Sequence, residues 1–297
     1  MNIGFHHIRS ISCGFGKAGV ALFSVLVFLT VTANTAHAVD CIPSLYGASY
    51  DGKYDPAIFK SINITNGISI HIGPTGFNRI STMDVDPTSG ILYAVAERHS
   101  GSAPDIEIKK VLISIDRRTG AGTQIAELSF GDDLEHEHIA GMSFDSSGTL
   151  YGYGSWDQGF YTIDVLAGTI ERIALNNLKA YGNALAFSPD DILYHVGDEF
   201  LNTVNLTSGL PTKVFESELV FNFLVDPNGI PAMDYGPETG LYYAVVKNGK
   251  DGETELATID VTTGVLEKVG DTSDNLDGLV YICDIPDVVF KDGFESP

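Results

Sequence analysis

Three short sequence signatures repeat along this chain of 297 residues, and they always follow one another in the same order. The first is an alternating apolar run that ends at a turn, as in ISTMDVDP; it occupies residues 80–87, 139–146, 182–189, 230–237 and, in degenerate form, 276–283. The second is the dipeptide Leu-Tyr, which begins at Leu45, Leu92, Leu150, Leu193 and Leu241. The third is an Asp or Asn four residues before a Gly, at Asn63/Gly67, Asp116/Gly120, Asp164/Gly168, Asn205/Gly209 and Asp260/Gly264. Five copies at a period of roughly 40 to 60 residues indicate one supersecondary unit that is used repeatedly.

Each signature predicts a particular piece of β-structure. The alternating run fits a strand that ends at a turn. Leu-Tyr places bulky side chains on both faces of one strand, which is typical of a strand that is covered on both sides. In the third signature the Asp or Asn side chain accepts backbone N–H bonds at the start of a hairpin turn, and the Gly supplies a positive φ. The repeated unit is therefore predicted to be a meander of four antiparallel strands.

Four-stranded units with this period predict an all-β fold, the β-propeller, in which each blade packs against its neighbours. The chain begins its repeats on a Leu-Tyr strand near residue 45 and ends them on an unpaired first-signature strand at residues 276–283. We therefore expect five blades, one of which is shared between the N-terminal and C-terminal strands. Two insertions, at residues 97–110 and 216–229, are too short to hide further blades.

The segment LAFSPDDILY (residues 185–194) resembles the entry strand of the YVTN and NHL repeats of secreted bacterial β-propellers. FYTIDVLAGTIERI (residues 160–173) and LATIDVTTGVLEKVG (residues 256–270) resemble the last two strands of the same repeats. The resemblance covers nearly all of residues 41–283 and implies the fold. It implies no single function, because propellers of this kind include binding scaffolds, lyases and lactonases.

The first 38 residues have the features of a secretory signal peptide. Arg9 and Lys17 precede an apolar run at residues 18–29, and Ala36-His37-Ala38 supplies a cleavage site. The apolar run is short for a membrane span, and an uncleaved anchor is the alternative. We expect a signal peptide at residues 1–38, a propeller domain at 39–285 and a tail at 286–297. The mature protein would be secreted or periplasmic, without a membrane span.

The charge of the chain narrows the range of partners. It holds 17 Lys and Arg against 39 Asp and Glu, a formal net charge of −22, and the two basic residues of the leader would be lost with it. Such an anionic surface repels phosphate backbones, so we expect no nucleic-acid partner. The partner is then a protein, a glycan or a small molecule, which the sequence does not distinguish.

One local group of residues is a candidate metal site. His136 and His138 point the same way on an extended segment that leads into an inner strand, and imidazoles are common ligands of divalent cations. We expect further N and O donors at the same mouth of the central channel, from Asn78, Glu137, Asn228, Asp274 and Asp277. The alternative is a solvated acidic loop, since residues 132–137 are rich in Asp and Glu.

Two other polar positions receive structural interpretations. Asp84-Val85-Asp86 stands at the end of a first-signature run and is interpreted as turn chemistry. His195 directly follows Leu-Tyr on a strand that packs on both faces, so it is expected to be structural rather than catalytic.

The leading functional hypothesis is a non-catalytic binding or interaction propeller, because the similar repeats hold no dense constellation of catalytic groups and no catalytic residue is assigned. The alternative is a divalent-metal-dependent lyase or hydrolase with its site at the channel mouth near His136 and His138. In that case a divalent cation is the cofactor. A structural component of a cell surface or matrix is a third hypothesis, which charge and export alone suggest.

Two cysteines remain once Cys13 is lost with the signal peptide, and they stand near the two ends of the repeats. Cys41 precedes the first Leu-Tyr strand, and Cys283 ends the last first-signature strand. Both align with the turn between the first two strands of an intact unit. We therefore predict a disulfide between Cys41 and Cys283 that closes the shared unit, which an oxidising compartment permits. The alternatives are two buried thiols and an intermolecular bridge.

Overall fold

The computed structural model describes residues 42–49, 55–101, 105–130, 138–175, 178, 182–197, 199–221, 223, 229–248, 254–272 and 274–284. All regular structure in these ranges is β-strand, as the repeats predict. Because the described ranges hold no helix, they also hold none that is long and apolar enough to cross a membrane. The expected signal peptide and C-terminal tail lie outside the described residues, as do Cys41, His136, Glu137 and Asn228.

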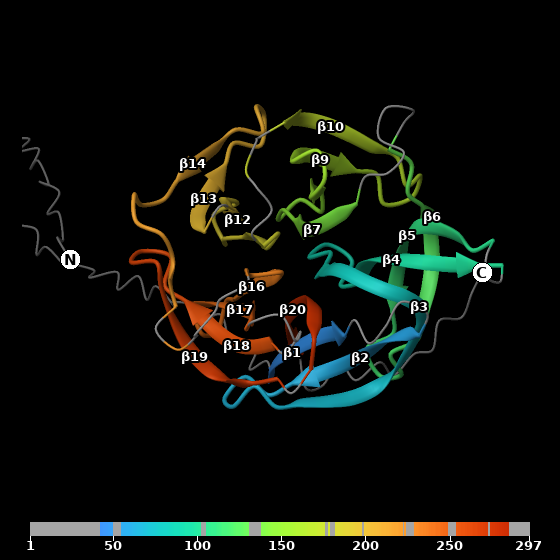
Figure 1. Cartoon of the computed structure of the whole chain (residues 1–297), viewed down its shortest axis with the longest axis horizontal. Coiled ribbons are helices and arrows are strands. Elements are labelled where there is room, and N and C mark those ends of the chain that lie inside the picture. The colour runs from blue at the N-terminus through green and yellow to red at the C-terminus, as the bar shows by residue number, and fades with distance from the viewer. Residues whose placement is uncertain are drawn as a thin grey trace, which may run out of the picture. The chain divides into compact units, whose positions relative to one another are not determined.

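The strands form antiparallel meanders of four, which we number as units 1 to 5 (Figure 1). Unit 1 contains β20 (Leu276–Asp284), β1 (Ile42–Ser49), β2 (Pro56–Ile62) and the first part of β3 (Ser69–Val85). Unit 2 contains the second part of β3, β4 (Leu92–Ser100), β5 (Glu107–Ile115) and β6 (Gly122–Glu127). Unit 3 contains β7 (Ile139–Phe144), β8 (Leu150–Gly154), β9 (Gly159–Ile163) and β10 (Ile170–Leu175). Unit 4 contains β11 (Leu185–Phe187), β12 (Leu193–Gly197), β13 (Phe200–Val204) and β14 (Pro211–Lys213). Unit 5 contains β16 (Ala232–Gly236), β17 (Leu241–Lys247), β18 (Thr254–Ile259) and β19 (Val265–Asp271).

The first signature forms the innermost strand of each unit: the second part of β3, then β7, β11, β16 and β20. The Leu-Tyr strand lies beside it, as β1, β4, β8, β12 and β17. In unit 5, however, the expected pair is displaced by one residue. Leu241 is 41% exposed, while Tyr242 and Tyr243 are both buried. Tyr243 lies opposite Asp234, just as Tyr93 lies opposite Asp84 in unit 2, so Tyr242-Tyr243 takes the structural place of Leu-Tyr.

The third signature forms the turn between the third and fourth strands, and its predicted chemistry is confirmed. At Asp116, Oδ1 accepts the N–H of Arg118 at 2.8 Å, and the backbone carbonyl accepts the N–H of Gly120 at 2.8 Å. The other four copies repeat both bonds, and the Gly of every copy has a positive φ. A short polar side chain and a Gly therefore fix the same hairpin five times.

Consecutive units are joined by apolar packing. Five clusters of buried apolar side chains lie among the described residues, and each draws on two units that follow one another. Phe59 and Ile113 belong to the cluster between units 1 and 2, and Leu45 and Val245 to the cluster between units 5 and 1. The innermost strands also contact one another in the order β3, β7, β11, β16, β20 and back to β3. Unit 1 itself is completed by antiparallel pairing of β1 with β20.

The outer strands follow the same cyclic order. Gly120 in the turn of unit 2 packs so closely on the outer strand of unit 1 that an added Cβ would lie 2.6 Å from the carbonyl oxygen of Gly73. Gly67 of unit 1 packs in the same way on Gly270 of unit 5. Glycine is needed at these turns both for its φ and for the approach of the neighbouring backbone.

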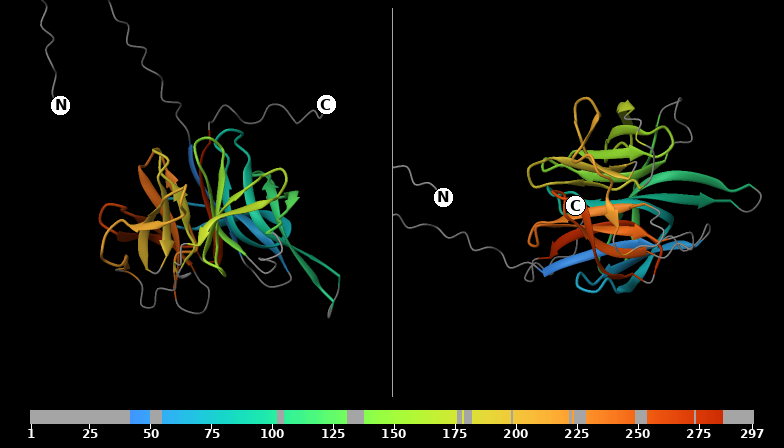
Figure 2. Two further views of the ribbon diagram at one scale, coloured as in Figure 1. Left: turned by 90° about the horizontal axis from the view of Figure 1, so that it is seen from above. Right: turned by 60° about the vertical axis from the view of Figure 1, so that its left-hand side comes forward.

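Two features depart from a simple repeat. β3 runs unbroken from unit 1 into unit 2, so these two units share one seven-stranded sheet. The insertion at residues 97–110 lengthens the β4–β5 hairpin, which continues in pairs from Glu97↔Lys110 to Ser100↔Glu107 and extends past the other described strands (Figure 2). Within the insertion at 216–229, β15 (Val220–Phe221) adds a short parallel strand to the outer edge of unit 5.

Candidate functional site

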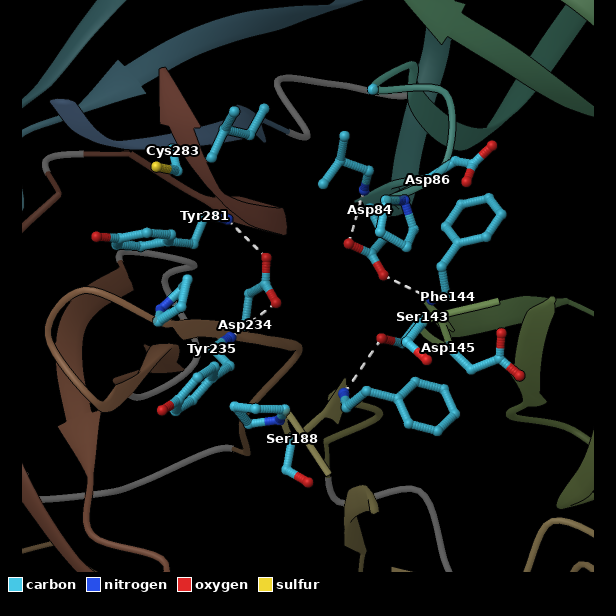
Figure 3. Close-up of a pocket in the computed structure, with 18 of the residues that line it drawn as sticks. Asp84, Asp86, Ser143, Phe144, Asp145, Ser188, Asp234, Tyr235, Tyr281 and Cys283 are labelled. Carbon is cyan, nitrogen blue, oxygen red and sulfur yellow. Dashed lines mark hydrogen bonds between the residues drawn. The ribbon is translucent and has the colours of Figure 1, made fainter. Parts of the chain in front are cut away.

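A cavity of about 510 Å³ lies where the innermost strands end (Figure 3). Its wall is built from the last residues of β3, β7, β11, β16 and β20, from the turns that follow the first four of these strands, and from Arg117 in the turn between β5 and β6. Four aromatic side chains and five carboxylates face or border it: Phe144, Phe187, Tyr235 and Tyr281, and Asp84, Asp86, Asp145, Asp191 and Asp234. Among the described lining residues Arg117 is the one basic side chain. The cavity is therefore aromatic and acidic.

Five backbone N–H groups of the innermost strands bond to three side chains at this cavity. Asp84 accepts the N–H of Val85 on Oδ1 and the N–H of Phe144 on Oδ2, each at 2.7 Å. Asp234 does the same for Tyr235 at 2.7 Å and for Tyr281 at 2.6 Å. The remaining donor, the N–H of Phe187, bonds to Ser143 Oγ at 3.3 Å (Figure 3).

The distribution of these acceptors follows from the repeat. The residue after the central Met or Leu of the first signature is Asp84, Ser143, Ala186, Asp234 or Val280. When it is polar, it bonds to the N–H of the next unit's innermost strand. Ala186 and Val280 have no side-chain acceptor, so the innermost strand of the following unit receives no such bond from them. In that strand the Asp accepts the N–H of the next residue itself: Asp234 in the unit after Ala186, and Asp84 in the unit after Val280. Two carboxylates thereby replace two missing acceptors, which avoids the cost of leaving a buried N–H unpaired.

Burial controls the electrostatics of the two carboxylates. Burial raises the pKa of Asp84 to about 6, and the charge of Asp86 adds to the rise, against hydrogen bonds from the N–H groups of Phe144 and Val85 and with the side chain of Ser143, which lower it. Burial, followed by the charge of Asp84, raises the pKa of Asp234 well above its ordinary value. The two groups therefore oppose each other's ionisation across the cavity.

The outer carboxylates of the cavity belong to turns. Burial raises the pKa of Asp86, but hydrogen bonds from Ser89 and Thr88 outweigh it and hold the pKa below its ordinary value. Asp191 accepts hydrogen bonds from the side-chain O–H and the backbone N–H of Ser146 in the neighbouring unit, and these bonds lower its pKa. The interpretation of residues 84–86 as turn chemistry is thus right for Asp86 and wrong for Asp84, whose bonds go to the innermost strands.

His138 and Asn78, two of the residues expected to form the metal site, lie at the beginning of innermost strands, the end away from the cavity. His138 is buried, and its Nδ1 lies 2.9 Å from the carbonyl oxygen of Ile139. Burial, and then the charges of Arg79 and Lys110, lower its pKa to about 4. Asn78 donates from Nδ2 to the carbonyl oxygen of Asp55 at 3.4 Å.

Two of the three predicted carboxylate donors, Asp274 and Asp277, each pair with a lysine. Asp274 Oδ1 lies 2.5 Å from Nζ of the fully buried Lys60, and Asp277 Oδ1 lies 2.6 Å from Lys247 Nζ. In the described part of the chain no group of three or more His, Cys, Asp or Glu is placed to hold a metal ion. His136, Glu137 and Asn228 lie outside that part, so their predicted role stays a prediction.

Sequence reasoning missed the charged group beside His138. Glu97 Oε1 lies 2.5 Å from Lys110 Nζ and 3.6 Å from a guanidinium nitrogen of Arg79, and its Oε2 lies 2.8 Å from His99 Nε2. Burial raises the pKa of Glu97, but the bonds from Lys110 and His99 hold it below its ordinary value. The charges of Arg79 and Lys110, which lower the pKa of His138, also disfavour a divalent ion there. The strand pairing that assembles this group leaves no local sequence signature.

No family model matches the chain, and no curated protein matches it. Among solved structures, the chain is similar to a chain of a nidogen/laminin complex, with 10% identity, 81% of this chain and 98% of that chain covered, and a TM-score of 0.48. It is similar to TolB from Acinetobacter baumannii, with 13% identity, coverage of 80% and 55%, and a TM-score of 0.46. It is also similar to the periplasmic gluconolactonase PpgL of Pseudomonas aeruginosa, with 11% identity, coverage of 78% and 83%, and a TM-score of 0.44. With identities this low and TM-scores below 0.5, these similarities assign neither a function nor a site.

Proposed function

We propose that this protein is an exported, non-catalytic binding protein built as a five-bladed β-propeller. Units 1 to 5 are its blades, and the pairing of β1 with β20 joins the two ends of the chain in the first blade. The cyclic contacts of the innermost strands and the cyclic order of the apolar clusters support this architecture. Its repeats resemble those of YVTN and NHL propellers, and its first 38 residues have the features of a signal peptide.

The cavity at the ends of the innermost strands is the proposed binding site, and its ligand carries a positively charged group such as an amine or guanidinium. The observation that carries this proposal is the convergence of carboxylates and aromatic rings on one concave space of about 510 Å³. Carboxylates attract a cation, and aromatic faces stabilise it further once it leaves water. A volume of this size suits a small ligand or a side chain of a partner protein.

The chemistry of the wall favours binding over catalysis. Its described residues include no His, and Cys283 is disulfide-bonded, so they offer neither an imidazole base nor a thiolate. Asp84 and Asp234 each accept two backbone N–H bonds, which suits carboxylates that supply charge and hold strands in place.

Calorimetric titration of the mature protein, residues 39–297, tests the site. Spermidine serves as the cationic probe, glucose as a neutral probe and gluconate as an anionic one, all at low ionic strength and pH 7. We expect one spermidine to bind, with an affinity that falls as salt is added, and the other probes to give no heat. Absence of spermidine binding would overturn the proposal for the ligand class.

Two variants locate the binding. Asp234→Asn removes one charge from the cavity wall and should weaken spermidine binding about tenfold or more. Asp260→Asn is the matched control, because it removes the same charge from an exposed turn of unit 5 where Asn supports the same hairpin. Equal losses in both variants would mean that spermidine binds to the general surface charge and not in the cavity.

Export is tested separately. N-terminal sequencing of the protein recovered from a bacterial periplasm or culture medium should begin near Val39. A mature protein that retains residues 1–38 would contradict the proposed cleavage.

A further inference from the structure

Asp84 and Asp234 have two roles at once, because they line the cavity and they hold the innermost strands together. Through these two side chains unit 2 is bonded to unit 3, and unit 5 to unit 1. We propose that Asp84 and Asp234 form a proton-controlled pair that couples occupancy of the cavity by a cation to the hydrogen bonds between neighbouring innermost strands. The coupling to a cation rests on the function proposed above, whereas the protonation of the pair and its effect on the strands do not.

The coupling follows from counting donors and acceptors. In the ionised form, each carboxylate oxygen is an acceptor, and each receives one backbone N–H. Protonation turns one oxygen into a hydroxyl, which is a weaker acceptor and needs an acceptor of its own. One of the two N–H bonds must then weaken. A cation in the cavity favours the ionised form, so its binding releases a proton and tightens the bonds between strands.

The surroundings make this pair different from the other carboxylates of the cavity. Burial raises the pKa of both groups, to about 6 for Asp84, whereas hydrogen bonds lower the pKa of Asp86 and of Asp191. The titratable and charged groups that face the pair from the elements around it are Asp86, Tyr93, Arg117, Asp145, Asp191, Tyr235, Glu238, Tyr242, Tyr243 and Tyr281. Burial raises the pKa of Tyr93, Tyr242 and Tyr281 above the ordinary value of a tyrosine, so carboxylates dominate the field that the pair experiences between pH 4 and 8.

Thr82 provides an internal control for the strand bonds, because Ser143 is itself hydrogen-bonded to Asp84. Thr82 Oγ1 accepts the N–H of Met142 at 3.0 Å, between the same two innermost strands that Asp84 joins, and a hydroxyl does not titrate in this range. A pH change that acts through the carboxylates should therefore affect the N–H groups of Phe144 and Tyr281 and leave that of Met142 unchanged.

An NMR titration of the full mature protein between pH 3.5 and 8 tests this difference. The carboxyl carbons are labelled on Asp and assigned with Asp84→Asn and Asp234→Asn. We expect the carboxyl of Asp84 to titrate near pH 6 and that of Asp234 well above the ordinary range of an Asp, and the amide protons of Phe144 and Tyr281 to shift with the same midpoints. Titration of both carboxyls below pH 4, or an equal shift of the Met142 amide, would overturn the proposal. The wild-type amide data decide the matter even if one variant does not fold.

Spermidine binding at pH 5, 6 and 7 tests the coupling to the ligand. A group with a midpoint near 6 is ionised in about a tenth of the molecules at pH 5, so the affinity should be about tenfold lower there than at pH 7. Calorimetry in two buffers of different ionisation heat should show proton release at pH 6. Binding without proton release and without pH dependence would overturn the coupling. Absence of binding at every pH, together with the expected NMR titration, would refute the ligand class and leave the proton-controlled pair intact.

Discussion

At the scale of single residues, His195 on β12 has the least satisfied polar side chain of the packed strands. It is 1% exposed, and neither ring nitrogen has a hydrogen-bond partner among the described residues. Its ring lies against that of Tyr153 of the neighbouring unit, with the centroids 4.3 Å apart. A buried polar group without a partner costs about 1 to 3 kcal/mol. We therefore predict that His195→Leu raises the free energy of unfolding in urea at pH 7 by about 1 kcal/mol or more.

The pH dependence of that variant gives a second readout. Burial lowers the pKa of His195 to about 3 in the folded state, while the unfolded chain takes up the proton near pH 6.5. Protonation of His195 therefore does not affect stability above about pH 6.5. As the pH falls from there toward 3, only the unfolded chain takes up this proton, and the folded state is progressively destabilised. His195→Leu should remove this part of the acid destabilisation. His71→Leu, at an exposed position, is the control, and an equal change there would contradict the prediction.

Lys60 presents the opposite case, a buried charge with a partner. Its side chain is fully buried, and Asp274, which also accepts the Oγ of Ser69, pairs with it across the boundary between units 1 and 5. Removing one member of a buried ion pair costs about 3 to 5 kcal/mol, because the other charge stays buried. We predict a loss of this size for Asp274→Ala in urea unfolding. The double variant Lys60→Met/Asp274→Ala should recover most of it, and additive losses would show that the two charges do not depend on each other.

At the scale of elements, the hairpin turns allow backbone strain to be separated from crowding. Gly120 and Gly90 have nearly the same φ, 77° and 71°, but a Cβ on Gly120 would meet the backbone of Gly73, whereas one on Gly90 would meet nothing within 4 Å. Gly90→Ala should lower the free energy of unfolding only through the strained left-handed backbone conformation, by about 1 to 2 kcal/mol. Gly120→Ala should lower the free energy of unfolding clearly more, because the backbone of Gly73 in unit 1 must also move away from the added methyl group. Equal losses in thermal unfolding would mean that the close approach at the outer strands contributes little.

The elements also show how far the sequence predicts this structure. The strands and the five Asx-Gly turns follow from local patterns, since each turn needs only a side-chain acceptor and a residue with positive φ a few positions apart. The displaced pair in unit 5 was not predicted, because Leu241-Tyr242-Tyr243 contains two candidate dipeptides and only the pairing across to Asp234 selects between them.

The site was less predictable than the strands, for a physical reason. The bond from Phe144 to Asp84 joins residues 60 positions apart, and the bond from Tyr281 to Asp234 spans 47 positions. Neither leaves a local motif. The available signal was the alignment of the repeats, in which the residue after the central Met or Leu is polar in three copies of five. The predicted metal donors Asp274 and Asp277 lie at the other end of the innermost strands, where each pairs with a lysine.

At the scale of the whole molecule, the two ends of the repeats meet in unit 1, where β1 and β20 pair from Ile42↔Asp284 inward. Cys283 lies opposite Pro43 in this register and is disulfide-bonded. Cys41, its predicted partner, lies outside the described residues, so the pairing itself stays a prediction.

A bridge between Cys41 and Cys283 would close almost the whole propeller into one loop. Because a cross-link restricts the unfolded chain more as the loop grows, its effect on stability approaches about 5 kcal/mol as an upper figure. We predict that Cys41→Ser/Cys283→Ser lowers the free energy of unfolding by several kcal/mol, and that the same loss appears when the wild-type protein is unfolded in a reducing agent. Peptide mapping of the unreduced mature protein should recover residues 41 and 283 in one cross-linked fragment of monomeric protein. A dimer held by Cys283, or two free thiols in protein taken from its oxidising compartment, would contradict this pairing and show that the strand bonds of unit 1 hold the chain ends together without a covalent link.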